Sequence, residues 1–179
     1  KRPSDEKSGI IELQVGNREH RQLNLDTTGA LTDNASYRLV AVYKDREGDL
    51  DHTDNERYYI APSVAIDLSD QTRLTVLSSL QKDDGVPVNG FKLPYGTIDD
   101  TPYGKVDRSA NLGQPGYDKN DRTQTAIGYE LEHTMDETWS FMQNVRYNRL
   151  DLELRSVYAG AQNPTDPRVA DQGLVYRDG

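Results

Sequence analysis

Carboxylates are the commonest side chains in this sequence that could do chemistry, and they gather most densely in one short stretch. Asp49, Asp51, Asp54 and Glu56 follow one another closely. Such a run could bind calcium, but it lacks the spaced acids, the central glycine and the closing glutamate of an EF-hand loop. We therefore interpret it as a solvated acidic loop.

The remaining reactive side chains show no pattern typical of an enzyme or of a resident metal. The three histidines, His20, His52 and His133, lack the spacing of zinc ligands. No serine stands in a nucleophile elbow, and Ser63 follows a proline. The chain has no cysteine, which removes disulfides, thiolate metal sites and thiol nucleophiles. We predict neither enzymatic activity nor a cofactor.

Composition narrows the class of protein further. The net charge of -9 argues against binding to nucleic acid, because phosphate contacts need a basic surface. Only 34% of the residues are hydrophobic and the mean hydropathy is -0.85, which is polar for a soluble sandwich of this size. No stretch approaches the roughly 18 consecutive apolar residues of a spanning helix.

The strongest structural signal is an alternation of apolar and polar residues over strands of membrane-spanning length. Tyr37, Leu39, Ala41 and Tyr43 share one face of a strand, with an aromatic ring at each end of the stripe. Residues 139–147 repeat the pattern and cover roughly 26 Å along the strand, or roughly 20 Å in height once tilted. That height is close to the apolar band of an outer-membrane barrel.

The full pattern predicts an all-β fold, an antiparallel meander of about seven strands. Pro62 lies inside the fourth strand and predicts a bulge or a missing hydrogen bond there. In the last strand the apolar phase slips at Leu150, which predicts either a bulge or a strand that continues above the bilayer. The predicted strands cover residues 9–16, 21–31, 36–44, 56–68, 72–82, 123–133 and 138–158.

The connections alternate in length, apart from a short first one. Those after the second, fourth and sixth strands are short, whereas those after the third, fifth and seventh are long. Short turns at one end and long loops at the other are typical of outer-membrane barrels. The longest connection, residues 83–122, is rich in glycine, proline and tyrosine, and we expect it to be an ordered loop with several turns. A soluble antiparallel β-domain that binds glycan or protein is the alternative, with its apolar stripes buried against a second sheet.

Several motifs, in order along the chain, resemble the TonB-dependent siderophore receptors, most closely the ferrichrome-type branch. Lys1-Arg2-Pro3 is similar to the tract that closes the plug domain, and it is not a plausible native start, so we expect residues upstream. The other resembling segments are residues 11–16, 56–63, 93–97, 112–117 and 139–147.

The resemblance implies part of a transmembrane β-barrel of about 22 strands that encloses a plug domain. Residues 1–8 would be the end of the plug and its linker, and residues 9–179 the N-terminal portion of the barrel. It also implies an outer-membrane receptor of a Gram-negative bacterium that imports ferric siderophore with energy from the TonB complex, which would act through the plug. Its partners would be the siderophore, which carries the iron, and outer-membrane lipid.

The same resemblance supplies candidate ligand residues. Phe91 matches an aromatic of a loop segment that presents rings to siderophore, and Asn89 stands where that segment often has a tyrosine. Tyr158 matches the first of two ligand-facing tyrosines, whereas Gly160 occupies the second position. Tyr95, Tyr103 and Tyr117 could also line the vestibule, although packing within the loop is favoured for each of them. A rigid aromatic ring suits the grip of a bulky ligand.

Overall fold

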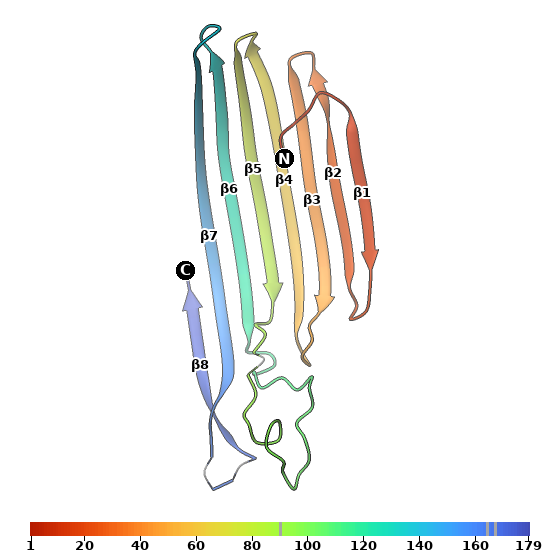
Figure 1. Cartoon of the computed structure of the whole chain (residues 1–179), viewed down its shortest axis with the longest axis vertical. Coiled ribbons are helices and arrows are strands. Elements are labelled where there is room, and N and C mark those ends of the chain that lie inside the picture. The colour runs from red at the N-terminus through yellow and green to blue at the C-terminus, as the bar shows by residue number, and fades with distance from the viewer. Residues whose placement is uncertain (90, 164, 167) are drawn as a thin grey trace.

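The computed structural model describes residues 1–89, 91–163, 165–166 and 168–179, and these residues form one antiparallel sheet in which neighbours in sequence are neighbours in space (Figure 1). Among the described residues there is no helix of the length and hydropathy needed to cross a membrane. The eight strands that these residues form are β1 (Ser8–Val15), β2 (Arg21–Thr32), β3 (Ala35–Glu47), β4 (Asp54–Ser69), β5 (Thr72–Gly85), β6 (Lys119–Thr134), β7 (Ser140–Gln162) and β8 (Ala170–Asp178).

The strand register confirms that the predicted apolar residues share one face. Residues directly opposite in an antiparallel pair point to the same side, and side chains alternate along each strand. Leu13 lies opposite Leu23, and Leu23 lies opposite Tyr43. Ala41 lies opposite Ile60, so by the same rule the apolar face continues onto β4 and the strands beyond it. The residues placed on this apolar face include Ile11, Leu23, Leu39, Ile60, Val76, Ile127 and Val145.

The apolar face is uncovered. Ile11 is 72% exposed and Ile127 is 55% exposed, and the only buried hydrophobic residues in the described part of the chain are Ala65, Ala126 and Val157. The sheet is a single layer (Figure 1). The soluble sandwich predicts a second sheet over this stripe, and the described residues form no such sheet. An extended apolar face without a protein partner fits a surface that contacts lipid.

The opposite face is polar, and the N-terminal segment lies across it. Lys1 Nζ is 2.6 Å from Asp26 Oδ2, and the Arg38 guanidinium donates to both oxygens of the same carboxylate at 2.8 and 2.7 Å. Arg2 Nε donates to Glu130 Oε2 at 2.6 Å, which reaches across to β6. Charged side chains therefore hold residues 1–3 over the middle of the sheet.

Two local expectations about strand irregularities are met. The pairing of β4 with β5 is interrupted at Ala61 and Pro62 and resumes in the same register at Ser63, because proline has no N–H to donate. The register of β7 with β6 runs unbroken from Ser140 to Arg155, so the phase slip at Leu150 marks a strand that continues, without a bulge against β6.

The connections also lie where the alternation in length predicts. The tight turns β2–β3, β4–β5 and β6–β7 lie at one end of the sheet, and the longer connections after β3, β5 and β7 lie at the other, together with the β1–β2 turn (Figure 1). The number of strands differs from the prediction. β8 was not predicted, and it pairs only with the distal part of β7, from Glu153 to Gln162.

Candidate ligand-binding loops

In its described residues the longest connection, residues 86–118, is built from successive turns, as the sequence predicts. The carbonyl of Pro94 accepts the backbone N–H groups of Thr97, Ile98 and Asp99 at 3.1, 2.9 and 3.0 Å. Gly96, with φ of +80°, allows the chain to reverse within this turn. Lys92 Nζ crosses the loop and donates to the carbonyls of residues 107 and 108 at 2.6 and 2.5 Å.

The loops at this end of the sheet also bond to one another. Asp51 N donates to the carbonyl of Ser109 at 2.7 Å, which joins the β3–β4 loop to the long connection. Glu47 N donates to the carbonyl of Arg18 at 3.0 Å, and the Arg18 side chain pairs with Asp49. The loop end is therefore one connected surface.

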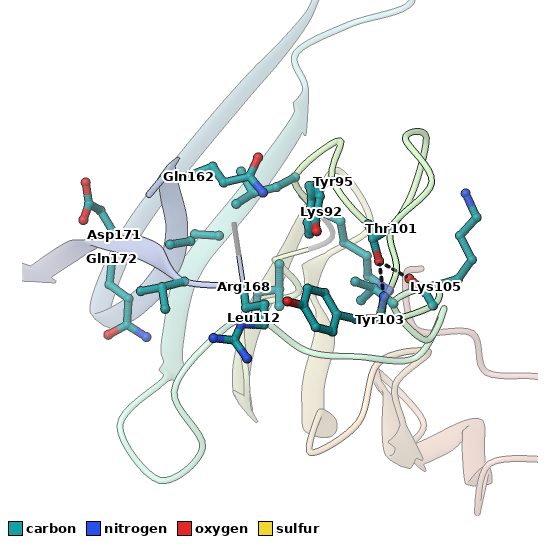
Figure 2. Close-up of a pocket in the computed structure, with 17 residues that line it drawn as sticks. Lys92, Tyr95, Thr101, Tyr103, Lys105, Leu112, Gln162, Arg168, Asp171 and Gln172 are labelled. Carbon is teal, nitrogen blue, oxygen red and sulfur yellow. Dashed lines mark hydrogen bonds between the residues drawn. The ribbon is translucent and has the colours of Figure 1, made fainter. Parts of the chain in front are cut away.

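A cavity of about 420 Å³ lies between the long connection and the β7–β8 hairpin (Figure 2). Its wall combines rings and aliphatic groups with cationic and amide side chains. From the long connection it takes Tyr95, Tyr103 and Leu112, and from the hairpin it takes Arg168 and Gln172. An apolar cavity with a few polar groups is the usual form of a small-molecule site.

Arg168 joins the two sides of this cavity. Its guanidinium lies 5.2 Å from the centroid of the Tyr103 ring (Figure 2). The same guanidinium donates to both carboxylate oxygens of Asp166, at 2.9 and 2.8 Å. These side-chain hydrogen bonds, with a further one from the Arg168 backbone N–H, lower the pKa of Asp166 to about 2. A cation beside exposed rings can bind a large anionic or aromatic ligand.

The structure separates the four candidate ligand residues. Tyr95 lines the cavity, whereas Phe91 is 82% exposed and does not. Tyr158 is 40% exposed and its ring lies over Gly173 of β8. The next pair along the ladder, Ala159 and Gln172, lines the cavity. Because side chains alternate along a strand, Tyr158 points to the opposite side of the β7–β8 hairpin. That side is continuous with the polar face of the sheet.

The fourth candidate, Asn89, makes contacts within the protein. Its Nδ2 donates to Ser156 Oγ at 2.6 Å and to the carbonyl of Val157 at 2.8 Å. The acidic run is likewise engaged locally, because Asp49 pairs with arginines and Glu56 Oε1 accepts the hydroxyls of Tyr43 and Tyr58 at 2.9 and 2.6 Å. No group of carboxylates and histidines suited to a metal ion occurs in the described residues.

Sequence reasoning missed the hairpin side of the cavity. Arg168 follows β7 in a segment for which no strand was predicted. Tyr103 was considered for the vestibule, but packing within the loop was favoured for it. The one available signal was the placement of an arginine and several tyrosines in connections at the same end of an antiparallel sheet.

Comparison with known proteins decides the family. No family model matches the chain. The ferrioxamine B receptor of Salmonella typhimurium strain SL1344 is 31% identical over 167 residues, and the ferrioxamine receptor of Yersinia enterocolitica is 32% identical over 164 residues. These matches cover 89% and 91% of this chain. The ferrichrome outer membrane transporter and phage receptor of Escherichia coli K12 is 26% identical over 88% of the chain. The chain belongs to the TonB-dependent siderophore receptors.

Solved structures agree on the fold of this receptor segment. The open form of the ferric-catecholate import receptor Fiu of E. coli K12 matches with a TM-score of 0.84 at 21% identity, over 99% of this chain and 30% of that chain. The ferripyoverdine receptor of Pseudomonas aeruginosa matches with a TM-score of 0.81 at 23% identity, over 99% of this chain and 24% of that one. At these identities the likeness is one of fold.

Membership of the family settles the class and the location. The chain spans about a quarter of the length of the curated relatives it matches, 23% of the Salmonella receptor and 22% of the Yersinia receptor. Those relatives are receptors and transporters, which agrees with the prediction that the chain is not an enzyme. The receptor segment belongs to the outer membrane of a Gram-negative bacterium.

Proposed function

We propose that the receptor containing this chain binds a ferric siderophore at its loop end and imports it with energy supplied through TonB. In this proposal residues 9–179 are the N-terminal portion of the barrel wall, and residues 1–8 are the end of a plug domain and its linker. Iron enters as part of the siderophore, and the receptor has no resident cofactor. The apolar face contacts outer-membrane lipid, and nucleic acid is not a partner.

The observation that carries this proposal is the position of residues 1–3 on the polar face. Lys1 and Arg2 are held there by the carboxylates of Asp26 and Glu130, on the side of the sheet opposite the apolar face. A segment that crosses the polar face supports a barrel interior occupied by protein. A plugged interior can couple ligand binding to an energy source, whereas an open pore cannot.

Phe91 and Tyr158 are the proposed ligand contacts. Phe91 is exposed on the long connection, and Tyr158 is half-exposed on the side continuous with the polar face. Rings of this kind offer apolar area at little cost in conformational entropy, which suits a bulky chelate. Tyr95 is a proposed contact for a ligand part that enters the cavity.

The test compares the siderophores named by the relatives. The intact receptor would be produced in an outer membrane that lacks other siderophore receptors, and iron-limited growth would be measured with ferrioxamine B, ferrichrome and a catecholate siderophore. We expect growth with at least one of them, and its loss when TonB is deleted. Growth that persists without TonB would contradict energy coupling, and no growth or binding with any of the three would contradict the proposed ligand class.

A further inference from the structure

Val157 lies beyond the end of the β6 ladder, yet both of its backbone polar groups are bonded. The last pair between β6 and β7 joins Lys119 to Arg155. Two residues further, Val157 N donates to Asp118 Oδ1 at 2.8 Å, and the Val157 carbonyl accepts from Asn89 Nδ2 at 2.8 Å. Val157 is only 2% exposed. Because unpaired buried backbone groups are costly, these two side chains act in place of a strand partner.

The two side chains come from opposite ends of the long connection. Asn89 lies four residues beyond the end of β5, and Asp118 immediately precedes β6. Each makes a second bond: Asn89 Nδ2 donates to Ser156 Oγ at 2.6 Å, and Asp118 Oδ2 accepts from Gln114 N at 2.9 Å. Asp118 and Ser156 are each 7% exposed. The contacts are therefore buried, and they close both ends of the connection onto β7 at Ser156 and Val157.

We propose that Asn89 and Asp118 are positioning residues that clamp both ends of the long connection to Val157 and so fix Phe91 relative to Tyr158. This inference rests on the proposed function. Phe91 follows Asn89 by two residues, and Tyr158 directly follows Val157. Asn89 acts through this clamp and not by touching ligand, because its amide is already bonded within the protein. A clamp formed before binding lowers the ordering cost that the ligand would otherwise bear.

The first measurement needs no ligand. Hydrogen exchange of the Val157 amide would be followed in the intact receptor and in Asp118→Asn, which keeps the size of the side chain but leaves one acceptor oxygen for two N–H groups. We expect exchange at least about tenfold faster, equivalent to about 1.4 kcal/mol of local opening. Asp99→Asn is the matched control. The exposed Asp99 side chain makes no hydrogen bond or ion pair within the described part of the chain, and its substitution should leave exchange unchanged.

The second measurement asks whether the clamp acts through Tyr158. Ferric siderophore affinity would be measured for Asp118→Asn, for Asn89→Ala, for Tyr158→Ala and for the two combinations with Tyr158→Ala. We expect each clamp variant to weaken binding about tenfold when Tyr158 is present and to have a much smaller effect once the ring is gone, because coupled residues are not additive. If Asp118→Asn fails to assemble, Asn89→Ala carries the test, since it leaves the Val157 N–H bonded.

The outcomes separate this inference from the proposed function. Unchanged exchange of the Val157 amide in Asp118→Asn overturns the clamp. Faster exchange with unchanged affinity, or with an equal loss of affinity in the Tyr158→Ala background, overturns the positioning role. If the unaltered receptor binds none of the siderophores, the proposed function fails, and exchange at Val157 alone still decides whether the clamp exists.

Discussion

The Tyr158 ring lies directly over Gly173 of the neighbouring strand, and a Cβ at position 173 would overlap the ring. The two residues are opposite one another in the ladder between β7 and β8, so the missing side chain of Gly173 is what lets the ring lie against the sheet. Gly173 therefore sets the direction in which Tyr158 points.

A Gly173→Ala substitution should displace the ring without removing it. We expect ferric siderophore affinity to fall by about tenfold, the equivalent of about 1.4 kcal/mol, because the methyl group takes the place of the ring. Calorimetric titration of the intact receptor would measure this. Gly16→Ala is the control, since its Cβ would meet only ordinary contacts with His20, at 3.5 Å or more. Unchanged affinity in Gly173→Ala would show that the position of the ring does not matter.

The second prediction concerns the lipid face. Ile127 lies on the apolar face near the middle of β6, so Ile127→Lys should destabilise the receptor in a bilayer by about 2–4 kcal/mol. Asn148→Lys tests the same new charge on the polar face of β7, where little change is expected. Urea unfolding from lipid vesicles measures both. Equal stability of the two variants would contradict the assignment of the faces.

The third prediction concerns Gly128, where the backbones of β6 and β7 approach each other closely. A Cβ at Gly128 would lie 3.1 Å from the Arg146 Cα and 3.3 Å from its Cβ, with the Val145 carbonyl closer still. Gly128→Val should therefore force β6 away from β7 and cost about 1–3 kcal/mol in unfolding free energy, which the same urea titration detects. A variant as stable as the original would mean that the two strands can separate without cost.

A fourth prediction follows from the ion pair at the cavity. Hydrogen bonds from Arg168 lower the pKa of Asp166 from 3.8 to about 2, so any stability from this pair is present above the ordinary pKa and is lost as the pH falls through about 2. Carboxyl NMR titration of the intact receptor should find Asp166 still ionised at pH 3. In Arg168→Ala its pKa should return toward 3.8. An ordinary pKa before substitution would mean that the pair does not form.

The faces of the sheet could be predicted from sequence because they follow from a period of two. Leu23, Ile60 and Val145 fall on one side whatever the details of the turns, once the register is antiparallel. β8 could not be predicted in this way. Its apolar alternation is limited to Leu174 and Tyr176, and it pairs only with the distal end of β7.

The site was predictable only where a motif marks it. Phe91 and Tyr158 were identified by resemblance, and the structure leaves both rings exposed enough to meet a ligand. The contact between Tyr103 and Arg168 joins two loops that are far apart in sequence, and no local pattern encodes it. The bonding of the Val157 backbone could not be predicted from the sequence either, because its partners are polar side chains at the two ends of the long connection.

The most direct test of the central claim is the affinity of the purified intact receptor for its ferric siderophore, measured alongside Phe91→Ala, Tyr158→Ala and the control Asp51→Ala. We predict clear binding by the unaltered receptor, about 30-fold weaker binding in each aromatic variant, equivalent to about 2 kcal/mol, and no change for Asp51→Ala. Thermal unfolding should be the same for all four proteins, since both rings lie beyond the lipid-facing band. Unchanged affinity in both aromatic variants, with folding intact and the correct siderophore in hand, would contradict the account.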